Sequence, residues 1–121
     1  MSFADALSDG RFLKLAELRP PKGVVMDELL EIGRRLHGRL DAVVVPDNPG
    51  AVMTLSATAL GRRLVEVGHE VILHASCRDR NRLALQSYLL GAYAEGLRSV
   101  LVSRGTDPAY GDHPRARAVY D

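Results

Sequence analysis

The sequence has little of several residue types, and each shortage excludes a class of protein. It contains one cysteine, Cys77, among 121 residues, so a scaffold of internal disulfides is excluded. The 16 lysines and arginines nearly balance the 15 aspartates and glutamates, and a formal net charge of +1 gives no electrostatic reason to expect nucleic acid as a partner. No apolar run approaches the ~20 residues that span a bilayer, and the N-terminal residues lack a secretory pattern. We therefore expect a cytoplasmic protein with neither a nucleic-acid nor a membrane partner.

The composition that remains is typical of one soluble domain. The chain is 46% hydrophobic and 26% charged. A chain of this length can bury about two thirds of the surface that it exposes when unfolded, so it needs no disulfide or structural metal to form a core. We expect a single domain over residues 1–121, in which residues 105–121 form a polar tail.

Short apolar runs alternate with longer segments of helical spacing. Three of the four runs start 28 or 29 residues apart, which indicates a repeated strand-helix unit. Apolar strands separated by single helices predict an α/β fold with a parallel sheet covered by helices. The predicted strands are FLKLAEL (12–18), AVVV (42–45), EVILHA (70–75) and SVLVS (99–103). A second helix is predicted over 54–67. Gly68 and Gly96 are predicted to end the second and third helices in a left-handed conformation, and Asn81 is predicted to be the N-cap of the third.

Polar residues follow each predicted strand. In parallel α/β folds the carboxyl ends of the strands lie on one side of the domain, and ligands bind there. A carboxylate, an imidazole and a guanidinium should therefore converge on one mouth. The residues concerned are Glu17 after the first strand, Asp47 and Asn48 after the second, His74 to Asn81 around the end of the third, and Arg104, Gly105 and Asp107 after the fourth.

Taken alone, these residues leave alternatives open. Glu17 is either a functional carboxylate, a solvated loop charge, or a cap of the helix after PPKG. His74 is either a ligand contact or a core histidine, and Arg78 either binds a phosphate or carboxylate or pairs with Asp79. His74-x-x-Cys77 is only half a metal site and no second cysteine exists, so we expect neither a metal site nor catalysis by Cys77.

Four blocks of sequence carry a resemblance to a known family. Together they resemble the amino-terminal half of the methylenetetrahydrofolate reductase family, and most of all the reductase module fused to homocysteine methyltransferase domains. The resemblance implies a TIM-type (β/α)8 barrel with FAD, which passes a hydride from NAD(P)H to the folate substrate in one-carbon and methionine metabolism. The blocks are ELRPPKG (17–23), DNP (47–49), HASCRDRNRLALQSYLLGAYAEGLRSVLVSRG (74–105) and GDHPRARAVYD (111–121).

The resemblance also implies roles for individual residues. Glu17 matches the general acid, which would protonate the amine nitrogen that is released when the methylene bridge opens. Enclosure in a barrel mouth favours the protonated form of such a carboxylate. His74 matches the histidine near the flavin, and Arg104 and Gly105 match a turn where a backbone without a Cβ can approach the isoalloxazine. Asp47 and Thr106 are further candidates for flavin contact.

Two positions depart from the family pattern. The family usually has an aspartate directly after the glycine, where this chain has Thr106 followed by Asp107. Neighbouring side chains at a strand end point in opposite directions, so the catalytic role assigned to Asp107 depends on whether it reaches the same place. The turn after the second strand reads PDNP in place of the threonine and tyrosine of simpler members.

Four strands are half of the eight that a barrel of about 250 residues requires. The apolar inner face and both sheet edges need a partner. We expect a homo-oligomer or a partner chain to complete the barrel, unless the chain is part of a longer enzyme. The alternative function is a non-catalytic half-barrel subunit that acts through assembly.

Overall fold

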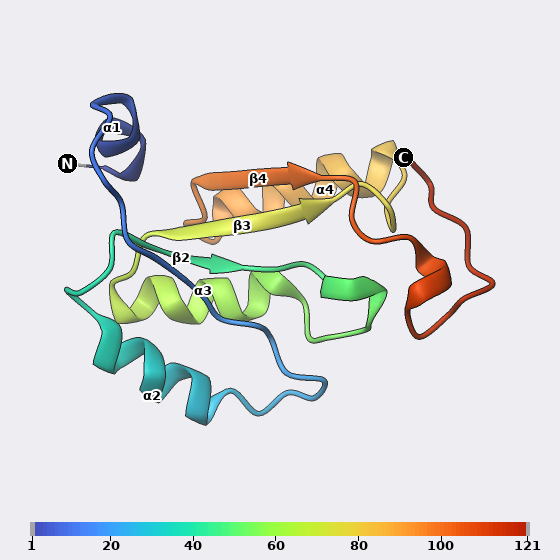
Figure 1. Cartoon of the computed structure of the whole chain (residues 1–121), viewed down its shortest axis with the longest axis horizontal. Helices are drawn as coiled ribbons and strands as arrows, with labels where there is room; N and C mark the ends of the chain where they lie inside the picture. The colour runs from blue at the N-terminus through green and yellow to red at the C-terminus, as the bar shows by residue number, and fades with distance from the viewer. Residues whose placement is uncertain (1, 121) are drawn as a thin grey trace.

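The computed structural model describes residues 2–120, in which four parallel strands alternate with helices (Figure 1). The sheet order is β1-β2-β3-β4, so strands that follow one another in the chain lie side by side. The α/β class is confirmed, and the arrangement is that of half a TIM-type barrel. The strands are β1 (Leu15–Glu17), β2 (Ala42–Val45), β3 (Val71–Ser76) and β4 (Ser99–Ser103). The helices are α1 (Phe3–Ser8), α2 (Asp27–Leu36), α3 (Ala57–Val67) and α4 (Arg82–Ala94), with 3-10 turns η1 (Pro49–Ala51) and η2 (Pro108–Tyr110).

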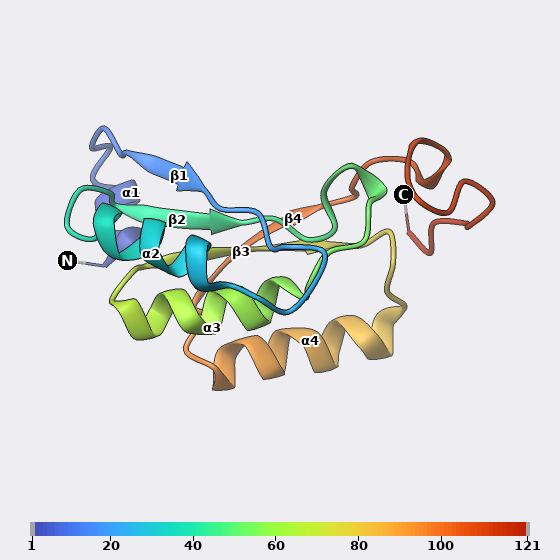
Figure 2. The ribbon, with the colours of Figure 1, turned by 90° about the horizontal axis from the view of Figure 1, so that it is seen from below.

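The hydrophobic core lies between one face of the sheet and the layer formed by α2, α3 and α4 (Figure 2). Alternate strand residues point to this layer, because successive side chains of a strand face opposite sides. The five largest fully buried side chains belong to it, and each contributes roughly 2 kcal/mol by burial. They are Val43 and Val45 of β2, Leu73 of β3, and Leu60 and Leu64 of α3.

The local signals for helix ends are confirmed. Asn81 begins α4, where its side chain accepts a hydrogen bond from the Ala84 N–H at 2.9 Å. Gly68 ends α3 with φ 104°, and Gly96 follows the end of α4 with φ 87°. None of the helices within residues 2–120 has the length and apolar character that a membrane crossing requires.

Some element bounds differ from the prediction by one to three residues. The first strand begins at Leu15 instead of residue 12, because the Lys14 N–H is bound by the Asp41 side chain at 2.7 Å. The helix predicted to begin at residue 54 is α3, and it begins at Ala57. Thr54 lies before it, where its N–H donates to the Asn48 side chain at 2.9 Å. The third strand is shifted by one residue, to Val71–Ser76.

Helix α1 was not predicted. It is short, but a capping box stabilises its start, in which Ser2 and Asp5 bind each other's backbone N–H groups. It lies at the end of the molecule where the strands begin (Figures 1 and 2).

The polar tail lies at the opposite end, where the strands finish (Figure 2). It contains η2 and is bound to the rest of the domain, since the Asp112 N–H donates to the Ala51 carbonyl at 3.1 Å and the Val119 N–H to the Arg78 carbonyl at 2.7 Å. Asp121, its last residue, lies outside the described residues. The tail is therefore part of the same side of the domain as the candidate functional residues.

Candidate functional site

The ends of the four strands surround one open cavity of about 410 Å³. Glu17 of β1, His74 of β3 and Arg104 after β4 all line it. The structure thus brings together the carboxylate, the imidazole and the guanidinium that the sequence placed at one mouth. We call this space the Glu17 cavity.

The register of the sheet explains the relative positions of Glu17 and His74. Glu17 is paired with Val44, and Val44 with Ile72, so these three residues form one row across the sheet. His74 lies two residues further along β3, opposite Leu101 of β4. Val43, Val45 and Leu73 point to the helices. The alternate side chains of Glu17 and His74 therefore stand on the opposite face, which is the inner face of the half-barrel.

Glu17 is only partly enclosed by its surroundings. Its side chain is 45% exposed, and its Oε2 atom lies 3.7 Å from Nε of Arg19. Such an exposed ion pair contributes little to stability, so the carboxylate can change partner at small cost. Glu17 is available for chemistry in the cavity, but these four strands do not shield it from water.

His74 and Arg104 present unused hydrogen-bonding groups to the Glu17 cavity. The main chain of His74 is fixed, because its carbonyl accepts a hydrogen bond from the Tyr88 hydroxyl at 2.9 Å. Neither the His74 ring nor the Arg104 guanidinium has a polar partner among residues 2–120. The two side chains can therefore bind a polar or anionic ligand without breaking an internal contact.

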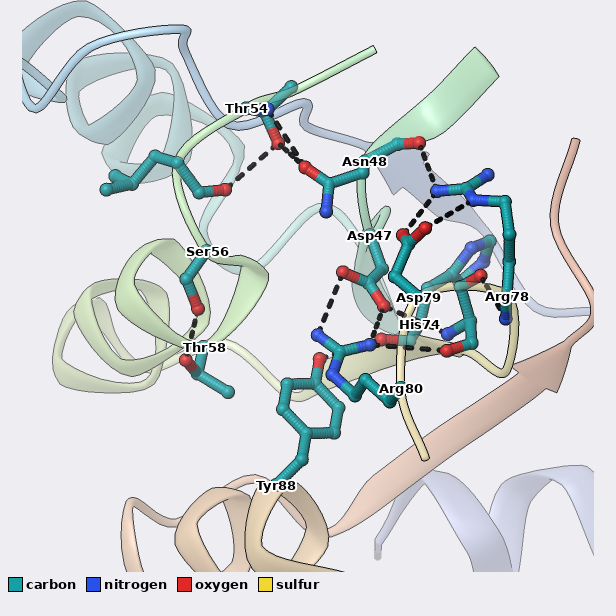
Figure 3. Close-up of polar contacts among 12 residues, drawn as sticks. Asp47, Asn48, Thr54, Ser56, Thr58, His74, Arg78, Asp79, Arg80 and Tyr88 are labelled. Carbon is teal, nitrogen blue, oxygen red and sulfur yellow. Dashed lines mark hydrogen bonds and ion pairs between the residues drawn. The ribbon is translucent and has the colours of Figure 1, made fainter. Parts of the chain in front are cut away.

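Asp47 also borders the Glu17 cavity, but its carboxylate is occupied by an internal ion pair (Figure 3). Its side chain is 3% exposed, and both oxygens accept hydrogen bonds from Arg80. Oδ2 also accepts the Ser76 N–H at 2.9 Å. The Arg80 guanidinium lies 3.9 Å from the centre of the Tyr88 ring, and burial raises the pKa of the Tyr88 phenol well above its usual value. A flavin that contacts Asp47, as predicted, would have to share the carboxylate of Asp47 with this network.

Arg78 joins the ends of three strands. Its side chain is 3% exposed and donates to the Thr106 carbonyl at 3.0 Å. It also donates to the Asn48 carbonyl at 3.2 Å (Figure 3). It also donates twice to Asp79, at 2.8 and 2.6 Å, and this hydrogen bonding holds the pKa of the Asp79 carboxyl below its usual value. Of the two alternatives for Arg78, the geometry supports the structural ion pair.

Gly105 is required by packing against Arg78. Its φ is +79°, and a Cβ at this position would lie 2.7 Å from the Ser76 hydroxyl and 2.9 Å from Nη1 of Arg78. The glycine therefore lets the chain after β4 approach β3 closely. This is a different reason from the predicted approach to an isoalloxazine ring.

Asp107 does not lie with Glu17 and His74. Its carboxylate accepts the Ala109 N–H at 2.9 Å and so begins η2. Asp107 lines a second cavity of about 350 Å³ with Arg117 and Tyr120, and it does not line the Glu17 cavity. The structure thus places Asp107 at the second cavity, and its catalytic role stays a prediction. Thr106, one residue earlier, borders both cavities.

Two residues with evident roles at this end of the domain were missed by the sequence reasoning. Tyr88 lies on α4 and fixes the His74 carbonyl, although its spacing marks it only as part of a helix. Asp112 lies in the GDHP segment and accepts the Met53 N–H at 2.8 Å. Such a contact between residues 59 positions apart has no local sequence signal.

Comparison with known proteins places the chain in a family context. A family model described as "Methylenetetrahydrofolate reductase" matches residues 2–121. No curated protein is similar enough to the chain to count as a match. The family match covers all four strands and every residue of the Glu17 cavity.

Proposed function

The chain belongs to the methylenetetrahydrofolate reductase family, and we propose that it supports the flavin-dependent reduction of methylenetetrahydrofolate by NAD(P)H. The family suggests an oxidoreductase of this type. The observation that carries the proposal is the convergence of Glu17, His74 and Arg104 on one cavity. FAD, the nicotinamide and the folate are parts of this proposal.

The residues of the Glu17 cavity fit a flavin. The volume of about 410 Å³ is within the range of roughly 300–1,000 Å³ found for small-molecule sites. The unpartnered His74 ring can hydrogen-bond a ring edge or a phosphate, and the Arg104 guanidinium suits a phosphate. FAD bound here would accept a hydride from NAD(P)H and pass it to the folate.

Glu17 would supply the proton that this reaction needs. Opening of the methylene bridge gives an iminium and leaves an amine nitrogen that must be protonated. The carboxyl group of Glu17 stands on the inner face, where it can reach a substrate in the cavity. Further strands around this face would exclude water and favour the protonated acid.

We propose that a second copy of the chain supplies those strands. Strands β1 and β4 each have one neighbour, and Leu101 and Val102 of β4 are 46% and 67% exposed. Two copies related by a twofold axis would pair β4 of each with β1 of the other, which gives eight parallel strands. This pairing would cover the edges and enclose Glu17.

A second candidate function is a half-barrel that assembles without catalysis. It is favoured by Thr106 at the position where the family usually has an aspartate, and by the carboxylate of Asp107, which is turned toward its own loop. In this case the exposed sheet edges would be the functional feature.

One experiment separates the two candidates. The oxidation of NADH and NADPH is followed with FAD and methylenetetrahydrofolate present, and the mass in solution is measured by light scattering. The first candidate predicts folate-dependent oxidation by a species of at least twice the mass of one chain. Assembly without any folate-dependent oxidation would favour the second, and a monomer would contradict the pairing of two copies.

A further inference from the structure

We infer that Asp112 is a positioning residue that holds the loop after β2 in the conformation that shapes the Glu17 cavity. The loop concerned is residues 48–53, and the inference rests on the proposed function as far as the ligand is concerned.

Asp112 contacts the 48–53 loop through both its main chain and its side chain. Its N–H donates to the Ala51 carbonyl at 3.1 Å, and its Oδ2 accepts the Met53 N–H at 2.8 Å. Its Oδ1 lies 4.0 Å from Nζ of Lys22, which follows β1. A single carboxylate after β4 thus reaches the loops after β1 and β2.

The 48–53 loop needs such external contacts because its backbone is strained. Asn48 has φ 44° and Ala51 has φ 60°, so both are in the left-handed region. Asparagine tolerates this region, whereas alanine rarely adopts it. The left-handed conformation of Ala51 costs about 1–3 kcal/mol and persists only where the surrounding structure holds it. Alanine has no polar side chain that could compensate. Besides the bond from the Ala51 N–H to the Asn48 carbonyl within the loop, the Asp112 N–H holds the Ala51 carbonyl from outside the loop.

The close approach of the segment around Asp112 to the 48–53 loop supports this inference. Gly111 lies against Ala51, and a Cβ on Gly111 would overlap the Ala51 carbonyl group. The segment with Asp112 therefore packs directly on the strained residue.

The conformation of the 48–53 loop determines one wall of the Glu17 cavity. Asn48, Pro49 and Gly50 line that cavity. Asn48 also connects the loop to Arg78, which donates to the Asn48 carbonyl at 3.2 Å. Release of the loop at Asp112 would let this wall move, and a ligand in the cavity would bind less tightly.

The test uses the whole chain with Asp112→Ala and Asp112→Asn, and it has two readouts. Hydrogen exchange by NMR reports the Met53 amide, with the Leu73 amide as an internal reference in the core. A fluorescence titration with FAD reports the Kd. The matched control is Glu95→Ala, which removes a carboxylate from the exposed ion pair with Arg62, whose atoms are 3.2 Å apart.

We expect Asp112→Ala to raise the exchange rate of Met53 and the Kd for FAD about tenfold each, while Leu73 is unaffected. Asp112→Asn should bring the exchange rate of Met53 and the Kd for FAD most of the way back to the wild-type values, since the amide oxygen of asparagine can still accept the Met53 N–H. Glu95→Ala should change neither.

Unchanged exchange at Met53 in Asp112→Ala would overturn the inference whatever FAD does. Faster exchange with an unchanged Kd would overturn the link to the cavity. A wild-type chain without affinity for FAD would refute the proposed function, and the Met53 exchange would still decide whether Asp112 holds the loop.

Discussion

The carboxylate of Asp47 and the guanidinium of Arg80, 33 residues apart in the chain, form a largely buried ion pair that ties the end of β2 to the loop after β3. The Asp47 side chain is 3% exposed and that of Arg80 is 18% exposed. A pair with so little contact with water depends on both partners, because either one alone would be a largely buried charge without its opposite charge.

Replacement of Asp47 with alanine should therefore destabilise the domain by about 3 kcal/mol, since it leaves the Arg80 charge unpaired. Urea unfolding at neutral pH measures the loss. The double variant Asp47→Ala, Arg80→Met should be more stable than Asp47→Ala alone, because it removes the orphaned charge as well. A loss below about 1 kcal/mol in the single variant would show that water compensates Arg80.

Two glycine substitutions should have opposite effects on stability. Gly105→Ala should destabilise by about 2 kcal/mol or more, because its φ of +79° disfavours a side chain and the new Cβ would meet Ser76 and Arg78. Gly91→Ala in α4 is the control, since a Cβ there meets no atom within 4 Å. It should stabilise the helix by up to about 1 kcal/mol. Thermal unfolding of both variants tests the expectation, and equal effects of the same sign would contradict it.

Part of the stability that the domain loses in acid should be lost through protonation of Asp79. Hydrogen bonds from Arg78 lower the pKa of Asp79 in the folded state below its ordinary value of 3.8. A lowered pKa gives stability that is fully present above the unfolded value and is lost as pH falls through the folded value. The contribution is modest, because the Asp79 side chain is 40% exposed and solvent screens the pair.

The check is the free energy of unfolding as a function of pH for wild type and Asp79→Asn. The difference between the two proteins should be constant above about pH 5 and should shrink below about pH 4. A difference that grew toward acid pH would have the wrong sign for this ion pair.

Glu17→Gln should separate binding from proton transfer. We expect turnover of methylenetetrahydrofolate to fall by about two to four orders of magnitude, which is the usual effect of losing a general acid. The affinity for FAD should stay the same, because glutamine keeps the shape of the side chain. Glu28→Gln, on the exposed surface of α2, is the control and should leave turnover unchanged. Equal turnover in Glu17→Gln and wild type would exclude Glu17 as the acid.

The repeated pattern of the sequence was sufficient to predict the parallel sheet and the side on which Glu17, His74 and Arg104 meet. Both follow from general rules, because apolar strands with single helical connections are parallel and their carboxyl ends share one side. The helix ends at Gly68 and Asn81 followed from local chemistry in the same way.

The partners of individual polar side chains could not be predicted. The sequence shows that Asp47 follows a strand, but it does not show that Arg80 occupies its carboxylate. Similarly, Asp107 binds its own loop, and Asp112 reaches Met53 across 59 positions. These outcomes depend on how three loops pack in space, and periodicity carries no information about that.

The titration of the purified chain with FAD tests the central claim most directly. Flavin fluorescence is followed for wild type and Arg104→Ala, since Arg104 lines the Glu17 cavity without a partner among residues 2–120. The account predicts saturable, stoichiometric binding by wild type and an affinity that is lower by about tenfold in Arg104→Ala. A colourless wild-type protein that takes up no FAD at any concentration in the titration would contradict it.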